Sequence, residues 1–244
     1  MCLVVFAVEV SRRYPVLIAA NRDERHARPA AAAAWWPERP QILAGRDLTA
    51  GGTWLAVDRR GRVAAVTNIR DGKQVAAPRS RGALVSELVS GNASAEDYAA
   101  HAARQGAQYG AYNLLLFDGR ELHYASNRAT AVPLGTGLHV FSNAPREVEW
   151  PKLASARAAV LRVAEHEAPI EPLFAMLAER SVAGPAEERH RVAHFVVGPT
   201  YGTRCSTVVL IDSTGQTTLA ERAFDSDGRQ IGEVRESFRV AAPH

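Results

Sequence analysis

The strongest constraint on the fold is the repeated pairing of short apolar runs across turn residues. Apolar runs at 3–9 and 15–20 are joined by Ser11 to Tyr14, and the runs at 54–58 and 63–67 flank Arg59-Arg60-Gly61-Arg62. Apolar runs of this length bounded by turn residues predict β-hairpins. Further strands are predicted at Tyr112–Phe117, Glu121–Ala125, Leu138–Ser142, Thr207–Ile211, Thr217–Ala223 and Glu233–Val240.

Segments with helical periodicity lie between these groups of strands. They are predicted at Gly82–Val89, at Ala95–Arg104 with Ser94 as its N-cap, at Trp150–Glu167, and at Ile170–Arg180 after Pro169. Parallel βαβ folds need a helix between nearly all strands, so this order favours mainly antiparallel sheet with helices packed outside it. Two stacked sheets covered by helices satisfy that pattern. We interpret the alanine tract at 30–34 as a surface loop.

Composition favours a folded chain and excludes several classes of function. The hydrophobic fraction is 47%, and a formal charge of +3 without a basic cluster interleaved with aromatics argues against a nucleic-acid partner. No apolar stretch approaches the about 18 residues that a membrane span needs. Two cysteines and the lack of a basic leader lead us to expect a cytoplasmic protein. Since we find no internal repeat or linker, residues 1–244 are predicted to form a single domain.

Cys2 is the first candidate for chemistry. Removal of Met1 would leave a thiol and a free α-amine on one residue, which combines a nucleophile with a base. The unperturbed pKa values, about 7.7–8.0 for the amine and about 8.5 for the thiol, are close enough for ready proton exchange. The alternative is a small buried hydrophobe at the start of a strand, and position alone favours that alternative.

A second candidate is the polar segment Asn21-Arg22-Asp23-Glu24-Arg25, which follows the apolar run Val16–Ala20. On a strand, Ala20 and Arg22 share one face while Asn21 and Asp23 share the other, so a carboxylate and a carboxamide can reach one site. The alternative is a solvated turn with local ion pairs, each contributing about 0–1 kcal/mol.

Further candidates stand at the ends of apolar strands. Asn68 follows Val63–Thr67 and Asn143 follows Leu138–Ser142, and an asparagine NH₂ group can stabilise an oxyanion. Arg204 opens a strand and can bind an anion. The alternative for each of these residues is that it has no functional role, because asparagine commonly forms turns at strand ends and an arginine can simply face water. The eight histidines have no ligand spacing, so we expect no metal site.

Taken together, these segments resemble the NRDE family, also called the transport and Golgi organisation 2 family. The resemblance covers nearly the whole chain. Its motifs are Met1-Cys2, Ala20-Asn21-Arg22-Asp23-Glu24, Arg28-Pro29, Gly51-Gly52-Thr53-Trp54-Leu55, Leu84-Val85, Tyr112-Asn113-Leu114, Ser142-Asn143-Ala144, Trp150-Pro151-Lys152 and Tyr201-Gly202-Thr203-Arg204.

The resemblance implies an α+β fold of the N-terminal-nucleophile hydrolase type, with four layers in the order αββα. It also implies distant similarity to choloylglycine hydrolases and penicillin V acylases, whose N-terminal cysteine attacks an amide. On that similarity Cys2 is the nucleophile, Asp23 orients its amine, Asn68 and Asn143 stabilise the oxyanion, and Arg204 matches a late arginine. Those hydrolases have arginine where this chain has Ala20. The thiol therefore lacks a nearby cation here, unless Arg22, on the same strand face, takes the place of that arginine.

Two functions therefore stand open. The family is associated with haem trafficking and with acyl-CoA, which implies a carrier of haem or an acyl ligand, while the residue chemistry favours a hydrolase of a small amide that needs no cofactor. In the carrier, Cys2 or His26 would ligate haem iron. The sequence leaves the ligand and the oligomeric state open. The residues assigned to ligand binding are Asn21, Arg22, Glu24, His26 and Trp54.

Overall fold

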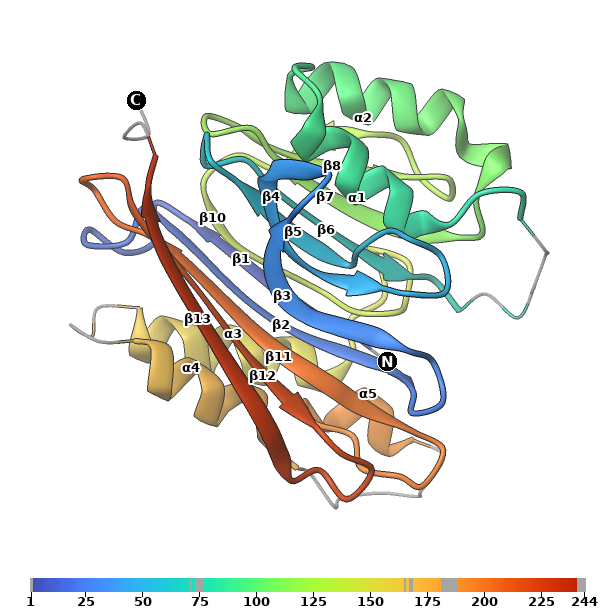
Figure 1. The fold of residues 1–244 in the computed structure, drawn as a ribbon, viewed down its shortest axis with the longest axis vertical. Helices are drawn as coiled ribbons and strands as arrows, with labels where there is room; N and C mark the ends of the chain where they lie inside the picture. Colours follow the sequence, from blue (N-terminus) through green and yellow to red (C-terminus); the bar gives the residue numbers. More distant parts are fainter. Residues whose placement is uncertain are drawn as a thin grey trace.

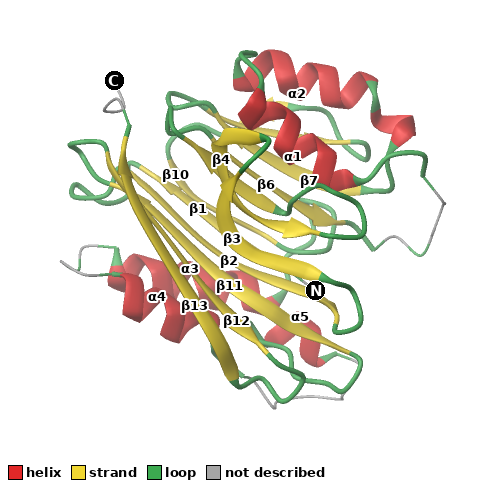
Figure 2. Ribbon diagram, viewed as in Figure 1, coloured by secondary structure: helices red, strands yellow, loops and turns green. Residues whose placement is uncertain are grey.

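Two antiparallel sheets stack face to face, and helices cover both outer faces (Figure 1). The computed structural model describes residues 2–70, 72, 77–164, 166, 169–180 and 188–240. Figure 2 shows the same four layers by type of structure, with one group of helices beyond each sheet. The predicted αββα sandwich of mainly antiparallel sheets is confirmed.

The first sheet has six strands in the order β10-β1-β2-β11-β12-β13, and its neighbours pair antiparallel. Two neighbouring interior strands carry the segments that the sequence singled out, because Cys2 precedes β1 and the polar segment forms the second half of β2. The strands are β1 (Leu3–Val8), β2 (Val16–Arg25), β10 (Gly137–Phe141), β11 (Tyr201–Ile211), β12 (Gln216–Phe224) and β13 (Gln230–Arg239).

The second sheet has seven strands in chain order from β3 to β9, again antiparallel. Its edge strand β3 leads directly out of the turn after β2, so the two sheets are joined close to the polar segment. The strands are β3 (Ala30–Trp36), β4 (Arg39–Asp47), β5 (Leu55–Asp58), β6 (Val63–Asn68), β7 (Tyr112–Phe117), β8 (Leu122–Ser126) and β9 (Val132–Pro133).

The helices divide between the two outer faces. Helices α1 (Arg81–Ser90) and α2 (Ala95–Arg104) cover the second sheet, whereas α3 (Pro151–Val163), α4 (Ile170–Leu177) and the short α5 (Arg189–Val192) lie on the side of the first (Figure 1). A 3₁₀ turn, η1 (Gly106–Gln108), follows α2. Within the described ranges, no helix is both long and apolar enough to cross a membrane.

Strand alternation sorts the core into three layers. Along β1, Val4 and Phe6 pack between the sheets, while Leu3 and Val5 pack under α3 and α4. A third apolar cluster lies between the second sheet and helices α1 and α2. The inner cluster draws on strands of both sheets, so the two sheets share one continuous interior.

Caps account for the helix starts that the sequence predicted. Ser94 accepts a hydrogen bond from the Asp97 amide at 3.0 Å, which confirms the predicted N-cap of α2. Ser80 caps α1 in the same way. The predicted helix at 150–167 begins as expected but α3 ends at Val163, with positions 165 and 167 outside the described residues, and α4 stops three residues before the predicted Arg180.

The sequence did not predict β4 and began β11 six residues late, at Thr207 rather than Tyr201, and two further strand assignments were wrong. The alanine tract at 30–34 is part of β3 rather than a loop, because Glu221 accepts the Ala33 amide at 2.8 Å and the Trp35 ring packs edge-on against Phe238. Alanine has weak strand propensity, so tertiary contacts determine this strand. The second error is β2, which continues beyond Ala20 through Arg25 because β11 pairs along its whole length.

Candidate functional site

Cys2 lies directly before the interior strand β1, and its backbone is fixed from two sides. Its carbonyl accepts a hydrogen bond from Ser142 Oγ at 2.7 Å and a longer one from Lys152 Nζ at 3.5 Å. By strand alternation the Cys2 side chain shares the inward direction of Val4. The residue is partly exposed. Cys2 therefore lies partly exposed at one end of the space between the sheets.

Ser142 belongs to a polar network that joins the two sheets beside Cys2. Its carbonyl accepts from Thr67 Oγ1 at 2.7 Å and from Asn113 Nδ2 at 3.1 Å. Asn113 also donates to the Ala144 carbonyl at 2.9 Å, so one buried amide holds the turn after β10 against strands β6 and β7. Sequence reasoning found Asn113 only as part of a family motif.

The two asparagines predicted as oxyanion donors meet in this network. Asn143 Nδ2 donates to the Asn68 carbonyl at 2.8 Å, and the Arg70 amide donates to the Asn143 carbonyl at 3.0 Å. Asn143 is buried, and its side-chain oxygen has no hydrogen-bond partner among the described residues. The Asn68 side chain is exposed. The structure therefore joins the two residues to each other next to Ser142, which holds the Cys2 carbonyl, with one amide hydrogen of Asn143 already engaged.

Asp23 faces the helix layer from β2 and is held by the neighbouring strand β11. It is 5% exposed, and Thr203 Oγ1 donates to its Oδ1 at 2.7 Å. The Tyr201 hydroxyl donates to the Asp23 carbonyl at 2.9 Å. Burial raises the pKa of Tyr201, and the nearby charges of Cys2 and Asp23 raise it further. Asp23, Tyr201 and Cys2 thus belong to one electrostatic environment.

Lys152 is a component of this environment that the sequence analysis did not assign. The second residue of α3, it is 0% exposed. Burial lowers its pKa, while the charges of Asp23 and Cys2 favour its protonated form. The sequence held one signal, since Lys152 is one of only two lysines among 29 basic residues.

Arg81, which begins α1 in the opposite helix layer, was also missed. It is the first residue of α1, and its Nη1 donates to the Ala111 carbonyl at 3.2 Å. Burial lowers the pKa of Arg81, and the charges of Cys2 and Glu24 act against that shift. Arg81 is far in sequence from Cys2 and from the polar segment that begins at Asn21, so no sequence pattern pointed to it.

Arg22 lies on the same face of β2 as Ala20, but its guanidinium is already engaged by other side chains. Its guanidinium stacks on the Trp54 ring at 4.3 Å and lies 3.5 Å from Asp47 Oδ2, with 6% of the residue exposed. Arg28 Nε binds the same Asp47 oxygen at 2.7 Å, and this hydrogen bond raises the pKa of Arg28. Arg22 and Trp54 thus form a buried stack on the inner face of the first sheet.

Asn21 has a structural position rather than one at the thiol. Its amide donates to the carbonyls of Leu177 and His194, both at 2.8 Å, and its oxygen accepts from Ser206 Oγ at 2.6 Å. Among the described residues, the hydrogen bonds of this side chain tie β2 to β11 and to the segments around α4 and α5. An amide that is fully engaged in this way anchors the helix layer.

The remaining predicted residues hold the turn that follows β2. Arg204 Nη1 donates to three carbonyls, with distances of 3.1 Å to Arg25, 2.9 Å to His26 and 3.2 Å to Arg28. The His26 ring lies 2.9 Å from the Gly198 carbonyl through Nε2. Glu24 lies 3.9 Å from Arg28. Arg204 and His26 therefore stabilise this turn through these bonds.

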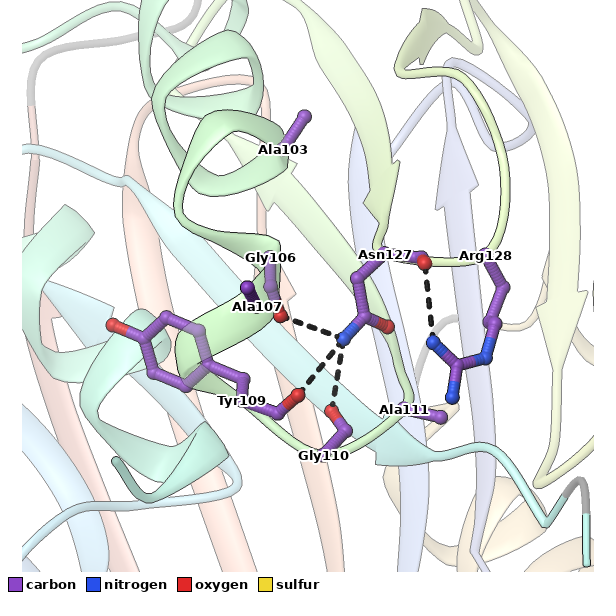
Figure 3. Close-up of a pocket in the computed structure, with 8 residues that line it drawn as sticks. All are labelled: Ala103, Gly106, Ala107, Tyr109, Gly110, Ala111, Asn127 and Arg128. Atoms are coloured by element: carbon purple, nitrogen blue, oxygen red, sulfur yellow. Dashed lines mark hydrogen bonds between the residues drawn. The ribbon is translucent and has the colours of Figure 1, made fainter. Parts of the chain in front are cut away.

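A separate pocket of about 360 Å³ lies where α2, η1 and the end of β8 meet (Figure 3). Asn127 Nδ2 donates to the carbonyls of Gly106 and Tyr109, each at 3.0 Å, so the amide seen in Figure 3 stabilises the wall. None of the predicted site residues lines it. Across the described ranges, no group of three or more His, Cys, Asp and Glu side chains is arranged to hold a metal ion.

Comparison with known proteins identifies the relatives of this chain. A family model described as Transport and Golgi organisation 2 matches residues 1–226. The chain belongs to this family. The Transport and Golgi organization protein 2 homolog of Bos taurus is 33% identical over 98% of this chain and 99% of its own length. The Homo sapiens homolog is 31% identical over 92% and 93%.

Solved structures confirm the expected type of fold. A variant of the conjugated bile acid hydrolase from Clostridium perfringens superimposes with a TM-score of 0.57 at 9% identity, covering 98% of this chain and 97% of the hydrolase. A Caenorhabditis elegans ortholog of N-acylethanolamine-hydrolyzing acid amidase gives 0.53 at 9% identity, covering 86% and 92%. The family member described here therefore has the N-terminal-nucleophile hydrolase fold.

Proposed function

We propose that this protein is a Cys2-dependent hydrolase that cleaves the C–N bond of a small amide. The observation that carries the proposal is the position of Cys2, whose carbonyl is fixed by Ser142 and Lys152 while the residue stays partly exposed. The fold neighbours support the reaction class, because both are named as hydrolytic enzymes and one as an amidase. The substrate itself is not specified by these features.

The reaction proceeds through a thioester on Cys2. The sulfur attacks the amide carbonyl carbon, and the thiol proton passes to the α-amine that removal of Met1 exposes. When the C–N bond breaks, this proton goes to the leaving nitrogen, which departs as an amine. Water then attacks the thioester, the C–S bond breaks, and the carboxylic acid leaves with the thiol restored.

Residues around Cys2 supply the remaining requirements of that reaction. Asp23 is buried and oriented by Thr203, and it can hold the α-amine as an acceptor. Asn143 has a second amide hydrogen besides the one bonded to Asn68, and this hydrogen can stabilise the oxyanion. The orientation of this amide is held by the inter-sheet network rather than by substrate.

The test is a screen of N-acyl amides with matched cysteine variants. We expect Cys2→Ser to lower turnover by about 1,000-fold or more, since the nucleophile is lost. Asn143→Ala should lower kcat by about 100-fold or more through loss of an oxyanion donor. Cys205→Ser is the control, because Cys205 is buried beside Glu221 and Thr207. Equal turnover by the wild-type and Cys2→Ser proteins contradicts the proposal.

A second candidate, a carrier of an anionic ligand such as haem or acyl-CoA, is favoured by the arginines near the thiol. The charge of Cys2 favours the protonated form of Arg81, acting against the lowering of its pKa by burial. Arg70 Nη2 lies 3.3 Å from the Tyr201 hydroxyl. Such groups pair well with propionates or phosphates. Titration with haem, monitored by absorbance, tests it: saturable binding that Cys2→Ser weakens, with no amide turnover, favours the carrier.

A further inference from the structure

Asn113, the second residue of β7, carries a buried side-chain amide that the proposed reaction does not use directly. It is 1% exposed and lies on the inner face of the second sheet, in register with Thr67 on β6. Its Nδ2 donates to the carbonyls of Ser142 and Ala144, at 3.1 and 2.9 Å. Its Oδ1 accepts a hydrogen bond from the Tyr124 hydroxyl at 2.9 Å. Both ends of the amide are therefore engaged.

The two carbonyl partners fix the orientation of this amide. A carbonyl oxygen can only accept, so the NH₂ group of Asn113, and not its oxygen, must face Ser142 and Ala144. Thr67 Oγ1 gives the Ser142 carbonyl a second hydrogen bond at 2.7 Å. Ser142 and Ala144 are both buried, so water does not readily replace a donor that is removed from these carbonyls. The turn after β10, residues 142–144, is thus held from the second sheet.

This turn carries two residues that the proposed reaction needs. Ser142 Oγ donates to the Cys2 carbonyl at 2.7 Å and so fixes the backbone of the nucleophile. Strands β1 and β10 pair antiparallel, and their register continued past the last pair places Asn143 opposite Cys2. The position of the proposed oxyanion donor therefore depends on the position of the turn.

We propose that Asn113 is a positioning residue, which holds the turn after β10 so that Ser142 fixes Cys2 and Asn143 presents its second amide hydrogen to the substrate. The inference deepens the proposed function, on which it rests, by assigning what sets the geometry of the oxyanion donor. Asn113 belongs to the second sheet and Cys2 precedes a strand of the first. Turnover therefore depends on a hydrogen bond across the space between the sheets.

A backbone amide at the end of β6 reports whether the turn stays in place. The Arg70 amide donates to the Asn143 carbonyl at 3.0 Å. While the turn is held, this hydrogen bond protects the Arg70 amide from exchange with solvent, and local release of the turn exposes it. The exchange rate of this amide therefore measures the position of the turn without any substrate.

The experiment replaces Asn113 by leucine, which has a similar branched shape but no donor. With an amide found in the screen, we expect Asn113→Leu to lower kcat by about 10-fold or more while KM changes by less than about two-fold, because the interaction lost is one made in the transition state. Exchange of the Arg70 amide, followed by NMR, should become faster by about 10-fold or more. If Asn113→Leu does not fold, Asn113→Asp replaces it, since this variant keeps the acceptor for Tyr124 and donates at most one hydrogen.

Tyr112→Phe is the matched control, because it removes a donor from another buried carbonyl at the neighbouring position of the same strand. The Tyr112 hydroxyl donates to the Ala102 carbonyl at 2.9 Å, on the face that packs against α2. This variant should lose stability in urea unfolding without changing kcat or the exchange of the Arg70 amide.

An unchanged exchange rate of the Arg70 amide in the Asn113 variant overturns the inference, and so does an equal change in Tyr112→Phe. An unchanged kcat in the Asn113 variant also overturns it. If no amide is turned over by the wild-type protein, the proposed function fails, and the exchange rates still decide whether Asn113 holds the turn.

Discussion

At the residue scale, neighbouring positions on β2 have different tasks because they face different layers. Asn21 and Asp23 face the helices, where Asn21 anchors α4 and Asp23 binds Thr203. Arg22 faces inward and stacks on Trp54. A motif that reads as one polar cluster in the sequence is therefore divided between two layers by strand alternation.

Glu221 is another strand residue whose role depends on the buried layer that it faces, and its pKa leads to a pH-dependent prediction. This buried carboxyl accepts from the Ala33 amide and from Thr207 Oγ1 at 2.9 Å, and burial raises its pKa above the ordinary value of 4.5. Between that value and the raised one, the folded state holds more protons than the unfolded state, so stability falls as pH rises. Relative to Glu221→Gln, the wild-type protein should lose stability from pH 4.5 upward, as measured by urea unfolding.

Glu233 provides the control of opposite sign. Its hydrogen bond with Arg222 lowers its pKa, so its stabilising contribution is present above pH 4.5 and is lost as the pH falls through the lowered value. Glu233→Gln should therefore match the wild-type protein best in acid, and its effect should be small because the residue lies at the surface. A stability difference for Glu221→Gln that stays constant with pH would show that the Glu221 pKa is not raised.

At the element scale, the start of α1 depends on a close approach between backbones. Helix propensity favours Gly82→Ala by about 1 kcal/mol. The added Cβ, however, would lie 2.9 Å from the Thr53 carbonyl oxygen. Forced contacts of this kind cost about 1–3 kcal/mol, so we expect a net loss of stability in thermal or urea unfolding.

Gly232→Ala is the matched control for this prediction. Its Cβ would have no heavy atom within 4 Å, so the smaller entropy of the unfolded chain should stabilise the variant by about 0.4–1 kcal/mol. If Gly82→Ala proves as stable as the wild-type protein, the start of α1 tolerates more room than the structure shows, and the position of Arg81 is less constrained.

At the scale of the whole molecule, the sequence predicted what local patterns determine. Hairpins and capped helices follow from turn residues and from Ser94, so the layered fold was predictable, and the strand ends pointed to Asn68 and Asn143. The strand at 30–36 was not predictable, because contacts with Glu221 and Phe238 determine it.

The cations of the site were missed for a related reason. Lys152 meets the Cys2 carbonyl only because α3 packs onto the first sheet, and the position of Arg81 depends on how α1 packs onto the second. No spacing in the sequence reports such packing. The motif containing Lys152 gave no role for its charge. A buried lysine becomes evident only when its surroundings are known, because periodicity places a residue on a face without saying what covers that face.

The most direct test of the central claim is the intact mass of the protein from its own host, measured after brief incubation with N-acyl amides and an acid quench. We expect a chain without Met1 that carries one acyl group, which peptide mapping assigns to Cys2 and which is absent from Cys2→Ser. A chain that retains Met1 and gains no acyl group on Cys2 would contradict the account.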